Sequence, residues 1–295
     1  MNPQDQIVTM QGIEKSCPLL KSSWSLFKNS WKTLVTIVVI PSLLNLVSGL
    51  LYQTKMPVLV IFGVIISIAA GILSVVMTIA LINAIHSLSG NPSAVISIKG
   101  IYKSGFGYFW SVVLISIIVG LSSLGSFMLL VVPGIIISIY VTFSAYALVI
   151  DGKKGFSAVT ESYSLVKGRW MTVFGRLIIL GLCVLGIQLI VALINFALAY
   201  ALGINVYEIA AAKGQIPYSV SLIGFALSLI SNSFIGPISA IYTYRLYNSL
   251  KATRGSEVSV VNFKRWIIAF MIIGPILFVA LVIVPAVFIL LNQLK

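Results

Sequence analysis

The chain has 295 residues, of which 59% are hydrophobic and only 8% are charged. A soluble domain carries about 25% charged residues, because a water-facing surface needs them. This composition excludes a soluble enzyme, a secreted disulfide scaffold, a disordered tail and a coiled coil. It indicates an integral membrane protein.

Ionisable residues are few and unevenly divided, with 19 Lys and Arg, six Asp and Glu, and one His. Proton-coupled transport normally needs an acid or a histidine inside a membrane span. The sequence places every acid in the N-terminal tail or in a loop, so it disfavours a proton pump or a proton-coupled transporter. The acids are Asp5, Glu14, Asp151, Glu161, Glu208 and Glu257.

The apolar tracts predict the spans. About 20 apolar helical residues cross a bilayer. The charge-free tract 108–150 would measure about 65 Å as one helix, so we expect it to fold back around Leu130–Gly134, where Pro133 supplies a break. The sequence predicts an all-α, polytopic transmembrane helical bundle. Residues 1–32 form a cytoplasmic tail and amphipathic interfacial helix, and residues 33–292 form one transmembrane domain. The seven predicted spans are residues 33–52, 57–85, 108–130, 133–150, 171–202, 218–247 and 266–291.

The basic residues predict how these spans are oriented. Sixteen of the 19 Lys and Arg residues fall on one side of the spans, and the other side has Lys55, Lys213 and Lys295. Because cytoplasmic loops are enriched in Lys and Arg, we expect a multi-pass protein of an inner or plasma membrane, of prokaryotic type. Its N-terminus is expected in the cytoplasm and its C-terminus outside. The same bias accounts for the net charge of +13, which therefore does not indicate nucleic-acid binding.

Two segments that precede long apolar tracts are alike. Residues 24–33 and 163–172 align without a gap and share Ser, Leu, Lys, Trp and Thr, and residues 93–106 carry part of the same pattern. We therefore predict three pseudo-repeats, each an amphipathic cytoplasmic helix followed by two transmembrane helices. Chance similarity is the alternative. The helix either braces the spans or contacts lipid. Its apolar stripe in the first copy is Leu20, Trp24, Phe27 and Trp31.

Several short motifs resemble a known family. They are Pro133-Gly134-Ile135, Asp151-Gly152-Lys153-Lys154, Ser157-Ala158-Val159 with Ser162, and Lys167-Gly168-Arg169-Trp170. Together they resemble the integral membrane domain family named after glycerophosphoryl diester phosphodiesterases, which occurs in bacterial and archaeal polytopic proteins of mostly unknown function. In that family the membrane domain is in some proteins fused to a soluble phosphodiesterase domain. A metal-assisted hydrolase needs clustered acids and histidines, and this sequence has one His and six scattered acids. We therefore expect no enzyme activity and no cofactor or metal.

Four basic residues form the first candidate site. Arg176 and Arg245 stand at the cytoplasmic ends of spans, and Lys167 and Arg169 precede the fifth span. An arginine fork matches phosphate oxygens, so these four residues are candidates for contact with an anionic lipid headgroup. The alternatives are ordinary snorkelling of flanking charges and a structural pairing of Glu161 with one of the arginines.

The sixth span contains the second candidate, an intramembrane polar site made of Asn232, Ser233, Gly236 and Pro237. A Gly-Pro break would remove helix hydrogen bonds and expose carbonyl groups, which can bind a substrate or an ion. The alternative is that these polar residues hold helices together, at about 0.6 kcal/mol each. His86 has no second histidine or nearby acid and is not a convincing metal ligand.

These observations leave two classes of function. In the first, the chain is a non-catalytic integral membrane protein that supports membrane, envelope or lipid organisation through lipid or protein contacts. In the second, it is a lipid or small-molecule transporter of flippase-like type. The expected partners are membrane lipids with anionic headgroups at the cytoplasmic leaflet, and either a protein partner or further copies of the chain. No nucleic acid is expected.

Overall fold

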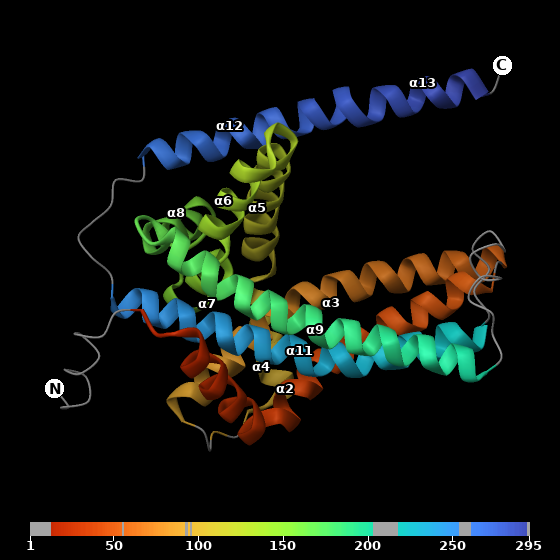
Figure 1. The fold of residues 1–295 in the computed structure, drawn as a ribbon, viewed down its shortest axis with the longest axis horizontal. Helices are drawn as coiled ribbons and strands as arrows, with labels where there is room; N and C mark the ends of the chain where they lie inside the picture. The colour runs from red at the N-terminus through yellow and green to blue at the C-terminus, as the bar shows by residue number, and fades with distance from the viewer. Residues whose placement is uncertain are drawn as a thin grey trace. The chain divides into compact units, whose positions relative to one another are not determined.

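A computed structural model describes residues 13–54, 56–91, 94, 96–202, 218–253 and 261–293 (Figure 1). Every regular element in these residues is helical. The helices are α2 (Ser16–Gln53), α3 (Pro57–Gly90), α4 (Ile98–Gly107), α5 (Phe109–Leu129), α6 (Val131–Val141), α7 (Ser144–Asp151), α8 (Phe156–Val166), α9 (Trp170–Ala201), α11 (Tyr218–Ala252), α12 (Val261–Phe278), the π-helical η1 (Val279–Ile283) and α13 (Val284–Gln293).

Six helical stretches in the described residues are long and apolar enough to cross a membrane. The prediction of an all-α polytopic bundle is confirmed. The stretches are Ser16–Gln53, Pro57–Gly90, Phe109–Leu129, Val131–Asp151, Trp170–Ala201 and Ser221–Ala252.

The charge-free tract folds back at Leu130. Its backbone is extended, with φ −162° and ψ 147°, and it separates the end of α5 from the start of α6. Pro133 lies in the first turn of α6, where its missing N–H costs no helical hydrogen bond. The break therefore falls at the first residue of the predicted range, and α5 packs against α6.

The predicted seventh span, residues 266–291, lies within a helical run that continues without a gap from Val261 to Gln293. It is divided among α12, η1 and α13, and it is not one of the six stretches found in the described residues. Pro275 and Pro285 have no backbone N–H to donate to the carbonyl four residues earlier. The wider π turn lies directly before the turn that contains Pro285, which is a position where such bulges relieve the missing bond.

The chain divides into two compact units. In the described residues, unit 1 contains residues 13–14, 107–176, 246–253 and 261–293. Unit 2 contains the remaining residues up to 106 and residues 177–202 and 218–245. The helices α9 and α11 each contribute residues to both units.

Unit 2 contains α2 packed along α3. Pro41 lies inside α2 and leaves the carbonyl of Ile37 without its helical N–H partner. The hydroxyl of Tyr102, on α4, donates a hydrogen bond of 2.6 Å to this carbonyl. The short helix α4 is thus fastened to α2 at the point where the proline interrupts the helical hydrogen bonds.

Unit 1 contains a close contact between α5 and α12. A Cβ atom added at Gly125 would overlap the carbonyl oxygen of Phe270, and one added at Gly274 would overlap the backbone of Gly125. Only glycine permits backbones to approach so closely. This contact fixes α12 against α5.

A serine of α8 holds the bend between α6 and α7. The Ser162 hydroxyl donates to the carbonyl of Tyr140 at 2.6 Å, and it accepts a hydrogen bond of 3.0 Å from the N–H of Phe143. Both backbone groups lie where the helical ladder is interrupted between Val141 and Ser144. Ser162 therefore satisfies these two backbone groups at the bend and positions α8 beside α6.

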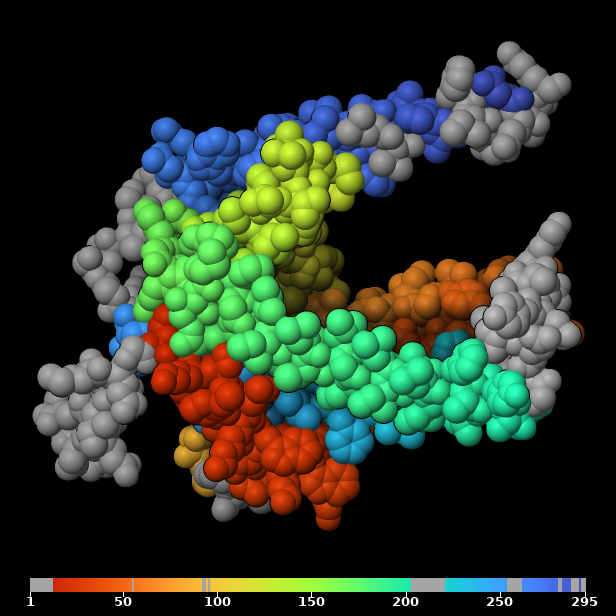
Figure 2. All heavy atoms as spheres, in the orientation of Figure 1, coloured from red at the N-terminus to blue at the C-terminus, as the bar shows by residue number. Residues whose placement is uncertain are grey.

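The long helix α9, green to teal in Figure 2, lies along the face of the molecule that the figure shows. None of the residues in its most apolar stretch is buried within the protein. Leu182 and Leu193, for example, are 60% and 67% exposed. An exposed apolar surface of this extent is typical of a helix that contacts lipid.

A short helix or helical segment precedes a long one in three places. In α2 the backbone leaves helical geometry at Ser30, α4 ends before α5, and α8 ends before α9. Gly168, with φ +80°, provides the last of these turns. The three-fold repeat itself stays a prediction. Its residues Ser93 and Val95, and the basic residues Lys55, Lys213 and Lys295 used for orientation, lie outside the described residues.

Candidate functional site

One face of α8 carries aromatic and basic side chains. Phe156, Tyr163 and Lys167 follow at spacings of seven and four residues, so they share a face. The Lys167 Nζ lies 5.6 Å from the centre of the Tyr163 ring. Lys264, from the first turns of α12, lies 5.7 Å from the centre of the Phe156 ring. Two ammonium groups therefore lie over aromatic rings on one side of unit 1, an arrangement favoured by the ring quadrupole.

The same face of α8 forms one wall of an open groove. The rings of Tyr163 and Phe263 stack with centres 3.8 Å apart and an angle of 7° between their planes. Tyr140 meets Tyr163 edge-on at 4.9 Å. We call the space beside these rings the aromatic groove; its volume is about 320 Å³. Its lining residues are Pro133, Ile136, Ile137 and Tyr140 from α6, Tyr163 from α8, and Asn262, Phe263, Trp266 and Phe270 from α12.

Arg169 joins the C-terminal ends of two helices. Its Nη1 donates to the carbonyl and hydroxyl oxygens of Thr253 at 2.9 and 2.6 Å. Its Nη2 donates to the carbonyls of Leu165 and Leu250 at 3.1 and 3.3 Å. Carbonyls at the end of a helix have no helical partner, and a cation there also complements the helix dipole. Partial burial lowers the pKa of the Arg169 guanidinium below its ordinary value.

Arg176 holds the chain that precedes α2. Its Nε and Nη2 donate to the carbonyls of Glu14 and Ile13, both at 2.6 Å, and its Nη1 donates to the carbonyl of Thr172 at 3.0 Å. The N–H of Glu14 donates to the Ser249 hydroxyl at 2.9 Å. Arg176 is only 9% exposed. We expected Arg169 and Arg176 to offer their N–H groups to a lipid phosphate. In the structure these groups donate to backbone carbonyls instead.

Arg245 belongs to unit 2, whereas Lys167, Arg169 and Arg176 belong to unit 1. The four predicted residues are therefore divided between the two units. The Nε of Arg245 is buried and has no hydrogen-bond partner in the described residues. Of the four predicted basic residues, Lys167 is the one that is exposed beside the aromatic groove.

The predicted intramembrane polar site lies in an uninterrupted helix. α11 continues through Gly236 and Pro237, so the expected break is wrong. The Ser233 hydroxyl donates to the Leu229 carbonyl of its own helix at 2.7 Å, and Asn232 is exposed. A single proline removes one helical hydrogen bond, and a helix can tolerate that loss when neighbouring groups compensate for it. Pro237 is buried.

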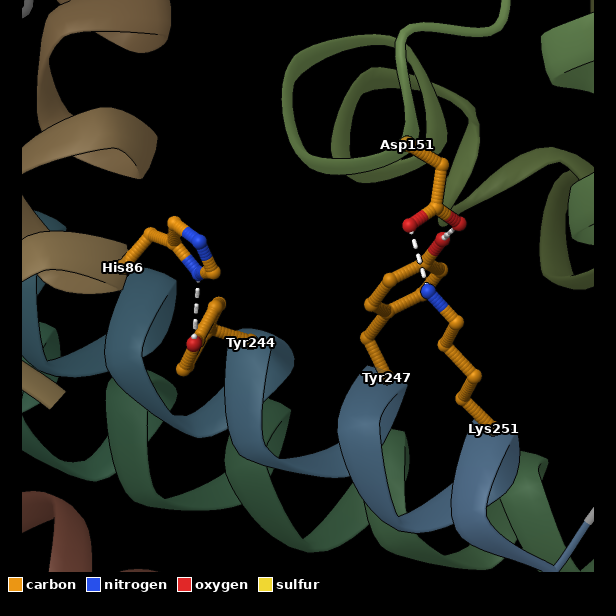
Figure 3. A network of polar contacts seen from close by, with 5 residues as sticks. All are labelled: His86, Asp151, Tyr244, Tyr247 and Lys251. Atoms are coloured by element: carbon orange, nitrogen blue, oxygen red, sulfur yellow. Dashed lines mark hydrogen bonds and ion pairs between the residues drawn. The ribbon is translucent and has the colours of Figure 1, made fainter. Parts of the chain in front are cut away.

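An ion pair in unit 1 was missed by sequence reasoning (Figure 3). Asp151, the last residue of α7, accepts a hydrogen bond from the Tyr247 hydroxyl and forms an ion pair with Lys251, each at 2.5 Å. Tyr247 is fully buried, and Tyr146 stacks on it with ring centres 6.0 Å apart. The spacing of four between Tyr247 and Lys251 was the available signal, since it puts both on one face of α11. This cluster fastens the end of α7 to α11.

The histidine has a partner in unit 2. His86 Nδ1 and the Tyr244 hydroxyl lie 2.9 Å apart, as Figure 3 also shows. His86 is exposed and Tyr244 is buried. In the described ranges, no group of three or more His, Cys, Asp or Glu side chains could hold a metal ion.

Comparison with known protein families gives one match. Residues 56–250 match a family described as a domain of unknown function, DUF7847. Because this match spans more than half of the chain, the chain belongs to that family. The match ends before α12, which supplies one wall of the aromatic groove. No curated protein and no solved structure matches the chain. The resemblance to the phosphodiesterase-associated membrane domain stays a prediction.

Proposed function

We propose that this chain is a non-catalytic membrane protein that organises anionic lipids at the cytoplasmic face of a cell membrane. The observation that carries this proposal is the pair of ammonium groups, Lys167 and Lys264, held over aromatic rings beside an open apolar groove. Aromatic side chains favour the headgroup level of a bilayer. A basic residue near an anionic leaflet contributes about 1 kcal/mol to binding.

The lipid contact proposed here differs from the four-residue site expected from the sequence. It retains Lys167 and adds Lys264, because both side chains are exposed. Arg169 and Arg176 are instead assigned a structural role, since their N–H groups bind carbonyls in unit 1. We do not propose a transporter. That alternative rested on a helix break at Gly236 and Pro237, and α11 continues through both residues.

The proposal includes the orientation predicted from the basic residues. Lys167 and Lys264 belong to the predicted side that carries most of the Lys and Arg residues, and cytoplasmic loops are enriched in these residues, which supports a position at the cytoplasmic leaflet. The N-terminus is then cytoplasmic, and the C-terminus is outside if residues 266–291 cross as a seventh span.

Charge-neutral variants test the proposal. The protein with Lys167→Gln and Lys264→Gln should lose most of its preference for dioleoyl phosphatidylglycerol over dioleoyl phosphatidylcholine, measured by native mass spectrometry from mixed micelles. Two contributions of about 1 kcal/mol each correspond to a loss of tenfold or more in relative affinity.

The matched control is Lys153→Gln with Lys154→Gln, which removes the same charge from an exposed turn of unit 1. Its effect should be less than threefold. Equal losses in the two double variants, or no preference for phosphatidylglycerol in the unaltered protein, would contradict the proposal.

A further inference from the structure

We infer that the aromatic groove holds one acyl chain of an anionic phospholipid, whose phosphate lies toward Lys167 and Lys264. This inference rests on the proposed function and names the ligand of the same site. It states that the aromatic groove of unit 1 receives the acyl chain. The proposed function requires only that the protein select an anionic headgroup.

The lining of the groove fits an acyl chain. Pro133 and Ile136 on one side and Phe270 on the other present apolar surface, and no charged side chain is among the lining residues. The volume of about 320 Å³ lies at the lower end of the about 300–1,000 Å³ found for small-molecule sites. A groove of this size takes part of one chain and leaves the rest in the bilayer.

Polar groups are placed so that they can receive the headgroup. Asn262 lines the groove and stands two residues before Lys264 in the exposed first turns of α12. Lys167 lies over Tyr163, which forms the wall on the α8 side. A lipid with an apolar tail and a phosphate matches this combination. An apolar peptide segment would leave both ammonium groups without an anionic partner, so charge complementarity favours the lipid.

Contacts within unit 1 hold the walls of the groove in place. Ser162 holds α8 to the α6–α7 bend through two hydrogen bonds, and the stacked rings of Tyr163 and Phe263 join α8 to α12. The Gly125–Gly274 contact holds α12 to α5. A preformed site loses little conformational entropy when it binds, which favours a resident lipid over transient contact.

A groove-filling variant tests the inference. Ile136→Trp places a large side chain in the groove from a half-exposed position, and Ile135→Trp adds the same side chain to the neighbouring half-exposed residue, which does not line it. We expect Ile136→Trp to reduce retention of dioleoyl phosphatidylglycerol by tenfold or more in native mass spectra. Ile135→Trp should change it by less than threefold. If both variants keep the lipid equally, the inference is wrong.

The unaltered fold offers an independent readout through Trp266, a wall of the groove that is 61% exposed. Phosphatidylglycerol with brominated acyl chains should quench Trp266 fluorescence more strongly than brominated phosphatidylcholine at the same mole fraction. The Trp266 signal is obtained by difference from Trp266→Phe. The control is the fluorescence of Trp110, which is 79% exposed and does not line the groove. This signal is obtained by difference from Trp110→Phe, and both brominated lipids should quench it alike.

The outcomes separate the two claims. Equal quenching of Trp266 by the two brominated lipids, together with headgroup selection by Lys167 and Lys264, would overturn the groove as the chain site and leave the proposed function standing. Absence of headgroup selection in the unaltered protein would overturn the proposed function and, with it, the assignment of the groove to an anionic lipid.

Discussion

Gly125→Ala and Gly274→Ala should each lower the melting temperature of the purified protein by roughly 5–10 °C. Each added Cβ atom would overlap backbone atoms of the facing helix, so α5 and α12 must separate. Overpacking of this kind typically costs about 1–3 kcal/mol, and a change of 1 kcal/mol shifts the melting temperature of a large domain by about 2–4 °C. Because α12 forms a wall of the aromatic groove, retention of phosphatidylglycerol should fall as well.

The control for this contact is Gly71→Ala. Gly71 lies in α3, and a Cβ atom there would meet no atom within 4 Å. Since alanine is a better helix former than glycine, this variant should be neutral or slightly stabilising. A melting temperature for Gly125→Ala equal to that of Gly71→Ala would show that α5 and α12 do not meet at these glycines.

Tyr102→Phe should lower the free energy of unfolding by about 1–3 kcal/mol, measured by denaturant or thermal unfolding in detergent. The hydroxyl of Tyr102 is the donor to the Ile37 carbonyl, which Pro41 deprives of its helical N–H. Leaving a buried carbonyl without a donor costs about this much. The phenylalanine ring keeps the packing, so the loss reports the hydrogen bond.

A double-mutant cycle with Pro41→Ala makes the test specific. Alanine at position 41 has an N–H that can donate to Ile37, so Tyr102→Phe should cost much less in this background than in the unaltered chain. The expected coupling is about 1–2 kcal/mol, within the range for residues that share one hydrogen-bond network. Additive effects of the two substitutions would contradict the assigned role of Tyr102.

The same tyrosine gives a pH dependence. Burial raises the pKa of Tyr102 from 10.0 to about 12. Between pH 10 and pH 12 the unfolded chain therefore loses this proton while the folded chain keeps it, so stability falls as the pH rises. The fall in stability between pH 10 and pH 12 should be smaller in Tyr102→Phe. A spectrophotometric titration of the folded variant should show one fewer tyrosine that ionises near pH 12.

The general architecture could be predicted from the sequence because membrane insertion acts through simple local quantities. Scarcity of charge and the length of the apolar tracts predict helices that cross a bilayer. The fold-back near Pro133 follows from the excess length of the tract 108–150. These properties depend on residues close together in the chain, so no tertiary structure is needed to read them.

The sequence was misleading where tertiary packing determines whether a proline interrupts its helix. Pro237 was expected to interrupt its helix, but the buried proline stays within a continuous α11. Residues 266–291 do lie in one helical run, but the sequence pattern did not indicate the π turn that precedes Pro285. The consequence of a proline depends on whether neighbouring groups compensate for the missing N–H, and the sequence pattern alone does not contain that information.

The candidate site could be predicted only in part, for a related reason. Lys167 was identified from its position before a span, but Lys264, whose ammonium group lies over Phe156 of the same helix α8, comes from a helix nearly 100 residues later. Arg169 and Arg176 looked suited to phosphate, and their carbonyl partners Thr253 and Ile13 lie far away in the chain. Charge predicts where a residue sits relative to a membrane, whereas the partner of each N–H is a property of the folded chain.

The central claim is that unit 1 selects an anionic headgroup at Lys167 and Lys264, and headgroup-directed photo-crosslinking in mixed bilayers tests it most directly. Phosphatidylglycerol with a diazirine on its glycerol headgroup should label residues 166–169 and 262–266 more heavily than the exposed turn at Lys153 and Lys154. A phosphatidylcholine analogue should label the three places according to their exposure. A phosphatidylglycerol pattern that matches the phosphatidylcholine pattern would contradict the account.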